Sequence, residues 1–79
     1  MQRTKFTYGD AVRIIDKQHI KEPEHDSGSI LAITVVVSEC LSNLYKEPIG
    51  TIMYHVEFRD GSSGNVPERA LQLLQEAHP

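Results

Sequence analysis

Residues 51–61 read TIMYHVEFRDG, and apolar and polar side chains alternate along most of this stretch. Successive side chains of a β-strand point to opposite faces, so one apolar set is predicted to share a buried face: Ile52, Tyr54, Val56 and Phe58. The opposite, outward face is predicted to carry Met53, His55, Glu57 and Arg59. Asp60-Gly61 follows at once and favours a two-residue hairpin turn of type I′.

Up to four further strands are predicted around this one. Residues 28–38 (GSILAITVVVS) are rich in β-branched side chains and apolar on both faces, which fits a central strand or one that bends to serve two sheets of a barrel. Residues 11–15 form a short strand after a turn at Gly9-Asp10, and residues 62–66 form the return strand of the hairpin. After Pro67 we expect a helical turn at 67–70 and a closing strand at 71–74, with a single helix over 67–77 as the alternative.

Two long connections separate these strands. Residues 16–27 are polar and charged and contain Pro23, and residues 39–50 contain Asn43, Pro48 and Gly50. Both are predicted to be surface loops, a class of segment that often carries function. Leu41, Leu44 and Tyr45 are apolar for a loop. They either fold back over one end of the domain or stand exposed as the anchor of an interface.

Several short patterns occur in order along the chain. They are Phe6 and Tyr8 ahead of Gly9-Asp10, the Gly28-Ser-Ile30 strand start, the Tyr54-x-Val56-x-Phe58 strand, Asp60-Gly61, and Val66-Pro67-Glu68. In this order the patterns resemble those of SH3-like barrels, including the Tudor, KOW and nitrile-hydratase-β-type members of that family. The resemblance implies a mainly β, partly open barrel of four to five antiparallel strands with a short C-terminal helical turn, as one domain over residues 1–79.

Composition and charge limit the classes of partner. Eleven acidic and eight basic side chains give a net charge of −3, and the basic residues are scattered along the chain. Nucleic-acid-binding modules usually concentrate Lys and Arg, so this balance argues against nucleic acid and favours a basic protein. The single cysteine excludes an internal disulfide, and no apolar run approaches the roughly 20 residues that span a bilayer. We expect a cytoplasmic protein without membrane contact.

No catalytic or metal-binding pattern emerges. His25-Asp26-Ser27 has the residue types of a hydrolase triad, but adjacent residues cannot orient one another as a relay requires. Five residues separate His19 from His25, and no second close His or Cys pair accompanies them, so no metal site is predicted. Cys40 stands beside Glu39, which disfavours its thiolate, and we expect it to be a buried or half-buried apolar residue. We therefore predict no enzyme and no cofactor.

The sequence thus favours a non-catalytic protein-binding module. The acidic balance and the 39–50 insertion are similar to small SH3-like immunity proteins of bacterial toxin systems, which implies occlusion of a cognate toxin. The alternatives are a nucleic-acid-associated module of the KOW or Tudor type and a structural subunit of a larger complex. The predicted partner-binding residues lie in the two long connections: Glu22, Glu24, Asp26, Glu39, Leu44, Tyr45 and Glu47.

Overall fold

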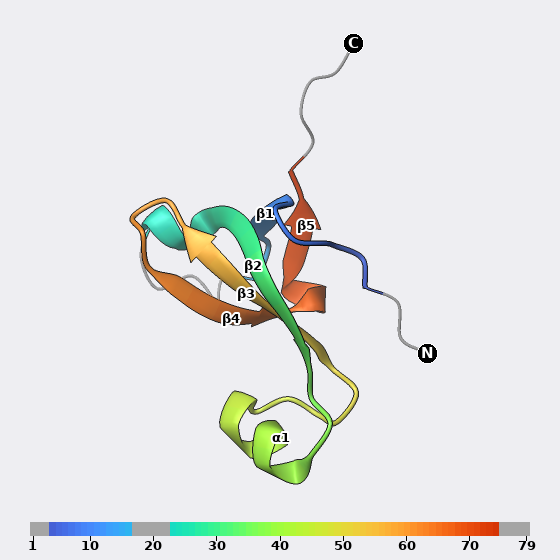
Figure 1. Ribbon diagram of the computed structural model, residues 1–79. Helices are drawn as coiled ribbons and strands as arrows, with labels where there is room; N and C mark the ends of the chain where they lie inside the picture. The colour runs from blue at the N-terminus through green and yellow to red at the C-terminus, as the bar shows by residue number, and fades with distance from the viewer. Residues whose placement is uncertain (1–3, 17–22, 75–79) are drawn as a thin grey trace.

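The computed structural model describes residues 4–16 and 23–74, with backbone only for residues 23 and 24. Five antiparallel strands form a single sheet in the order β4-β3-β2-β1-β5 (Figure 1). They are β1 (Ala11–Ile14), β2 (Ser27–Val35), β3 (Ile52–Phe58), β4 (Ser63–Pro67) and β5 (Leu71–Leu73). The helices are α1 (Glu39–Tyr45) and two 3-10 turns, η2 (Pro23–Asp26) and η3 (Glu68–Ala70). The predicted mainly β class is confirmed.

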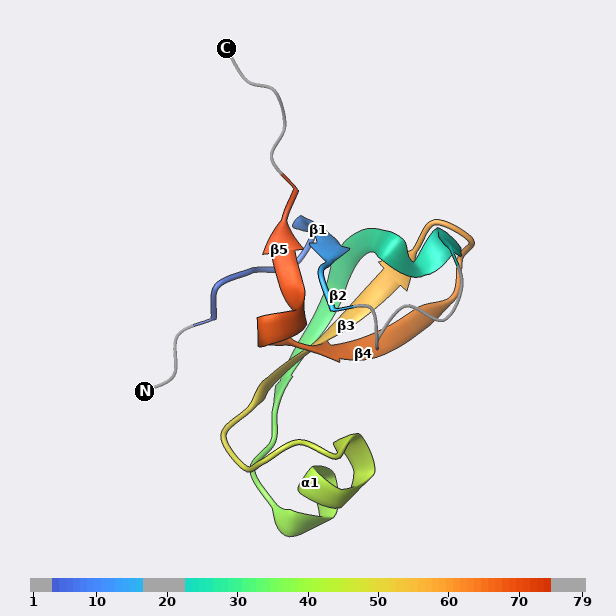
Figure 2. The same cartoon turned by 180° about the vertical axis from the view of Figure 1, so that it is seen from behind.

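The sheet is open among the described residues. β4 and β5 are its two edges, and β1 pairs with both β2 and β5. Figure 2 shows β2 and β3 running from the main body of the sheet toward α1, which lies at their far end. All five predicted strands agree with the structure to within about three residues at each end, and the largest difference is at the end of β2, which stops at Val35.

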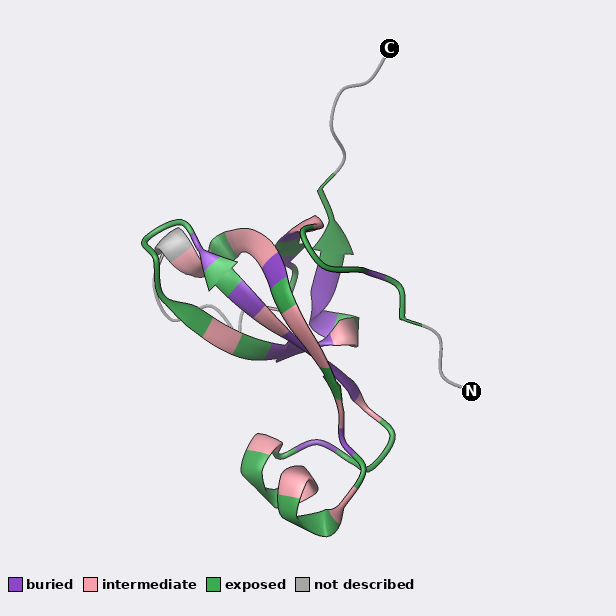
Figure 3. Ribbon diagram, viewed as in Figure 1, coloured by how far each residue is buried: buried purple, intermediate pink, exposed green. Residues whose placement is uncertain are grey.

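The buried face of β3 matches the predicted alternation. Its inward side chains, Ile52, Tyr54, Val56 and Phe58, are all buried and belong to the hydrophobic core. Figure 3 shows this buried band along β3, in contrast to the exposed and half-buried ribbon of α1. Met53 lies on the opposite face of β3, as the alternation predicts, but it is only 2 % exposed. It is therefore not a surface residue, and it lines a groove together with Leu44 and Tyr45.

The apolar character of both faces of β2 has its origin in a β-bulge. Ile30 pairs with Val56 and Ala32 with His55, so Leu31 is an extra residue in this strand. The bulge shifts the inward positions by one, from Ile30 before it to Ile33 and Val35 after it. β2 therefore contributes even-numbered residues to the core before the bulge and odd-numbered residues after it.

The hairpin between β3 and β4 differs from the predicted two-residue type I′ turn. The Gly61 N–H donates to the Phe58 carbonyl at 3.0 Å, and the Phe58 N–H donates to the Ser62 carbonyl at 2.8 Å. Gly61 has φ 89°, whereas Asp60 has no positive φ, which a type I′ turn requires. The loop is therefore the three-residue type with a glycine bulge, and the type I′ prediction is wrong.

The segment after β4 follows the predicted turn and strand. η3 spans Glu68–Ala70, and β5 then pairs with β1, so a single helix over residues 67–77 is excluded. Ala70 and Leu71 are buried, and the Ile15 N–H donates to the Ala70 carbonyl at 2.8 Å. Pairing with β1 therefore favours the extended conformation of residues 71–73, although this sequence also has good helix propensity.

Tyr54 ties the N-terminal segment to the sheet. Its hydroxyl donates to Glu68 Oε2 at 2.7 Å and accepts the Phe6 N–H at 3.3 Å, and the Lys5 N–H donates to the same carboxylate oxygen at 3.0 Å. The Phe6 and Tyr54 rings meet edge to face, with centroids 5.3 Å apart. Burial, followed by the hydrogen bond to Glu68, raises the pKa of Tyr54 to about 12.

Candidate functional site

The connection between β2 and β3, residues 36–51, is an ordered arm built around α1, and we call it the α1 arm. The prediction that residues 39–50 form a loop is wrong for residues 39–45, which form α1. Ser38 caps the helix by accepting the Leu41 N–H at 3.2 Å, and Lys46 ends it in the left-handed conformation with φ 57°. The arm is joined to the sheet by the Val36 N–H to Thr51 carbonyl bond at 2.8 Å.

The α1 arm exposes large apolar side chains. Val37 is 69 % exposed, Leu44 68 % and Ile49 60 %, and these are three of the eight large apolar residues exposed in the described part of the chain. Tyr45 is half-buried, and α1 itself contains no buried residue. The sequence left open whether these apolar residues fold back over the domain or stand exposed, and Leu44 is exposed.

Glu47 is not the exposed rim carboxylate that the sequence predicts. Its side chain is 7 % exposed, and Arg69 Nη1 and Nη2 donate to its two oxygens at 2.5 and 2.8 Å. This bidentate hydrogen bonding raises the pKa of Arg69 above its already high value, against an opposing effect of burial. The pair fastens the base of the α1 arm to η3, so Glu47 has a structural role.

A groove of about 370 Å³ lies between the α1 arm and β4. All five residues of β4 line it, together with Met53 and Phe58 of β3. Leu44, Tyr45 and Glu47 contribute from the α1 arm, and His25 contributes from η2. Three of the predicted site residues are therefore brought together on one wall of this groove.

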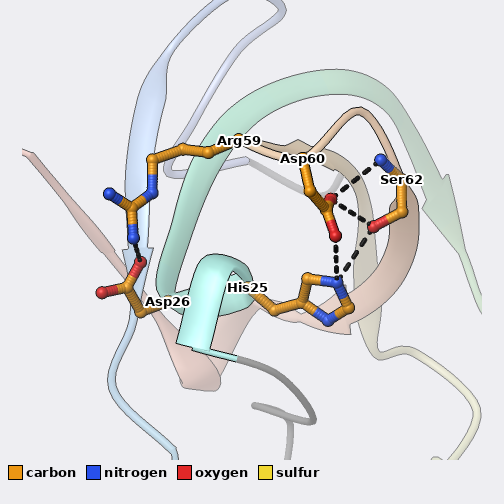
Figure 4. Close-up of polar contacts among 5 residues, drawn as sticks. All are labelled: His25, Asp26, Arg59, Asp60 and Ser62. Atoms are coloured by element: carbon orange, nitrogen blue, oxygen red, sulfur yellow. Dashed lines mark hydrogen bonds and ion pairs between the residues drawn. The ribbon is translucent and has the colours of Figure 1, made fainter.

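At the hairpin end of β4, a polar cluster joins η2 to the turn (Figure 4). His25 Nε2 lies 3.2 Å from Asp60 Oδ2 and 2.9 Å from Ser62 Oγ, and the Ser62 hydroxyl donates to Asp60 Oδ1 at 2.6 Å. The His25 ring stacks on Phe58 with centroids 4.4 Å apart. Hydrogen bonds from the Ser62 hydroxyl and N–H, with a smaller contribution from His25, hold the pKa of Asp60 below its usual range.

This cluster has the residue types of a hydrolase triad but a different geometry. Both Asp60 and Ser62 approach the same nitrogen of His25, Nε2. In a Ser–His–Asp relay the carboxylate binds Nδ1, which leaves Nε2 for the serine hydroxyl. The arrangement therefore cross-links η2 to the hairpin, and it places His25 in a packed position rather than in the solvated loop expected from the sequence.

The predicted acidic residues do not form one surface. Asp26 is exposed and pairs with Arg59 at 3.0 Å, whereas Glu39 is exposed at the start of α1. The nine-residue strand β2 separates them, and η2 and α1 lie at opposite ends of it in both ribbon views. Glu24 belongs to η2, its side chain lies outside the described atoms, and Glu22 lies outside the described residues.

Cys40 is exposed on α1, so the prediction that it is buried or half-buried is wrong. Among residues 4–16 and 23–74, no three His, Cys, Asp or Glu side chains lie close enough to hold a metal ion. Within the same ranges, no helix has the length and apolar character needed to cross a membrane.

Comparison with family models, with curated proteins and with solved structures found no match to this chain.

Several residues of the groove were not predicted from the sequence. The rings of His25 and Phe58 stack although 33 positions separate the two residues in the sequence, and no local sequence pattern predicts such a contact. The helix of the α1 arm did leave a signal, since Leu41, Leu44 and Tyr45 have helical spacing after a serine that is a good N-cap. Its length of seven residues kept that signal short.

Proposed function

We propose that this chain is a non-catalytic protein-binding module of the SH3-like type, and that the α1 arm is its principal contact surface. The observation that carries the proposal is the exposure of Val37, Leu44 and Ile49 on one ordered projection. Large apolar side chains in solvent are normal singly, but several on one projection are typical of an interaction site. The Glu47–Arg69 pair holds this projection in place before any partner binds.

The barrel part of the proposal rests on the path of the chain. β2 carries the Leu31 bulge, and such bulges bend a strand and increase its twist. β1 pairs with β5, and η3 turns the chain between β4 and β5. These features support a curved sheet of the partly open kind that the resemblance implies.

The proposed partner is a basic protein. Glu39 is exposed beside the apolar residues of the α1 arm, where a carboxylate favours association with a cationic surface. We propose further that the partner is a toxin that the chain neutralises by occlusion, as the resemblance to immunity proteins implies. Co-expression with the product of a neighbouring reading frame tests this: wild-type chain restores growth, and a Leu44→Ser/Ile49→Ser variant does not. Equal rescue by both chains contradicts a role for the arm.

The main experiment uses fragments of the source organism's genome displayed on phage. Overlapping fragments of one protein are expected to bind wild-type chain, and Leu44→Ser/Ile49→Ser is expected to weaken binding by about tenfold or more. Tyr8→Ser is the matched control, because Tyr8 is 65 % exposed and its neighbour Gly9 donates its N–H to the Ile30 carbonyl, in the part of β2 before the bulge and away from the arm. If the arm variant and the control bind alike, the arm is not the contact surface.

The nucleic-acid alternative has less support from the charges. Arg59 and Arg69 are both paired with carboxylates, so they are not available to phosphates without breaking those pairs. Filter binding with RNA and DNA at low and high salt separates the two functions. Tight, salt-sensitive retention of either nucleic acid contradicts the protein-binding proposal.

A further inference from the structure

The outer edge of β4 has backbone groups that the sheet does not use. The Phe58 N–H bonds the Ser62 carbonyl, and the hydrogen-bonded positions of an antiparallel pair alternate from there. The register therefore directs the Gly64 and Val66 backbone groups toward β3, and those of Ser63 and Asn65 away from it. No described strand pairs with this outer edge, because β4 ends the sheet.

This edge lacks the usual protection against strand pairing. Proteins block exposed edges with charged side chains, prolines or bulges. Residues 63–67 (SGNVP) carry no charge, and the one proline, Pro67, stands at the end of the strand. Residues 63–66, which precede this proline, can therefore pair with another strand.

The groove lies along the same edge. It is lined by the whole length of β4, with Tyr45 and Leu44 at its wall and His25 stacked on Phe58. When a peptide adds to a sheet edge, main-chain hydrogen bonds give affinity, and pockets for alternate side chains give specificity. A groove beside a free edge supplies both elements.

Negative charge near the outer edge of β4 favours a basic segment as its occupant. Glu57 and Asp60 are exposed carboxylates next to β4, whereas the guanidinium of Arg59, between them in the sequence, is already paired with Asp26. Glu57 is exposed and is the cross-strand neighbour of Ser63, which brings a carboxylate to the edge itself. The same carboxylate disfavours a second copy of this chain at the edge.

We propose that the free edge of β4 accepts an extended, lysine- or arginine-containing peptide segment of the partner protein as a sixth strand. The inference rests on the proposed protein-binding function and names the form of the bound partner. The Ser63 and Asn65 backbone groups bond the incoming strand, and alternate side chains of the peptide enter the groove between β4 and the α1 arm.

Amide hydrogen exchange of the wild-type chain tests the proposal directly. The probe is a short synthetic peptide in which valine alternates with lysine, and the control peptide has glutamate in place of lysine. At about 90 % saturation the lysine peptide is expected to slow exchange at Ser63 and Asn65 by about tenfold, since only the free tenth of the chain exchanges. Unchanged exchange at both amides, or equal binding of the glutamate peptide, overturns the proposal.

A pair of variants isolates the backbone donor. Asn65→Pro removes an N–H that β3 does not use, and Asn65→Ala keeps that N–H while losing the same contact between Asn65 Oδ1 and His55. The proline variant is expected to weaken binding of the lysine peptide by about tenfold or more relative to the alanine variant. Equal affinities overturn the edge as the site, whereas loss of binding only in Leu44→Ser/Ile49→Ser leaves the protein-binding function standing.

Sedimentation of the free chain tests the other occupant. A concentration-dependent dimer that Asn65→Pro dissociates and Asn65→Ala does not overturns the proposal, because a second copy then covers the edge. A monomer for all three chains is the expected result.

Discussion

Glu47 and Arg69 lie 22 residues apart in the chain and form a two-pronged ion pair in which the carboxylate is buried and the guanidinium is largely exposed. The Ser42 hydroxyl donates to the Glu47 carbonyl at 2.6 Å, so the same residue also closes the end of α1. Because Glu47 touches both α1 and η3, it couples the position of the α1 arm to the sheet.

Replacement of Arg69 by alanine is expected to lower the free energy of unfolding by about 2–3 kcal/mol, because the buried carboxylate loses its cationic partner. Glu47→Gln is expected to cost less, about 1–2 kcal/mol, since an amide can still accept from Arg69. Urea denaturation of both variants measures these values.

The double variant provides the control for that pair. If the bond couples the two side chains, Glu47→Gln/Arg69→Ala loses less than the sum of the single losses. Additive losses show instead that each residue acts alone.

Tyr54→Phe is expected to destabilise the chain by about 1–2 kcal/mol near neutral pH, because the Phe6 N–H and Glu68 lose a common partner. The raised pKa of Tyr54, about 12, adds a pH signature. A raised folded-state pKa means that this stability is complete below the ordinary value of about 10 and is lost as the pH rises toward 12. The wild-type advantage over Tyr54→Phe therefore shrinks between those pH values, and a constant difference contradicts the assignment.

Gly28→Ala is expected to destabilise the chain strongly, by about 3 kcal/mol or more, because β3 approaches this residue closely. An added Cβ lies 2.1 Å from the Glu57 carbonyl oxygen and 2.8 Å from Val56 Cγ1. Gly64→Ala is the matched control, since its Cβ meets nothing closer than Phe58 Cε2 at 3.4 Å. Thermal unfolding compares the two, and similar midpoints contradict the tight crossing at Gly28.

His25→Ala is expected to lower stability by about 1–2 kcal/mol through loss of the stack on Phe58 and of the polar contacts. His25→Phe keeps a stacked ring and removes only the polar contacts, so it is expected to lose less. Equal losses for the two variants assign the contribution to hydrogen bonding alone.

Ionisation of the Asp60 carboxylate makes the stability of the folded chain depend on pH in the acidic range. Its pKa is lowered in the folded chain, so its stabilising effect is present above the ordinary value near 4 and is lost as the pH falls through the lowered value. Unfolding curves of wild type and Asp60→Asn are expected to converge as the pH falls below about 4. A stability difference that persists in strong acid contradicts the expectation.

The strands were predictable because their evidence is local. Alternation over residues 51–59 and the β-branched run from Gly28 place side chains by period alone, without knowledge of any partner. The turn type at Asp60 was missed because a single Asp-Gly pair fits both two-residue and three-residue loops. The bulge at Leu31 was missed because register depends on the neighbouring strand.

The candidate site was predictable only in part. Leu44 was identified because an apolar side chain in a polar segment is visible in the sequence. The burial of Glu47 and the stacking of His25 depend on residues more than 20 positions away, which local patterns do not encode. The open edge of β4 follows from strand order, which requires the complete sheet.

The Leu31 bulge separates the bend of β2 from the order of its core contacts. Deleting this one exposed residue would restore a regular ladder and leave Ile33 and Val35 facing inward, because Ala32 would then follow Ile30 on the opposite face. The extra residue therefore contributes local bend and twist to the strand, and the core does not depend on it. Related sequences are expected to differ at this point in residue type and also by the presence or absence of this one residue.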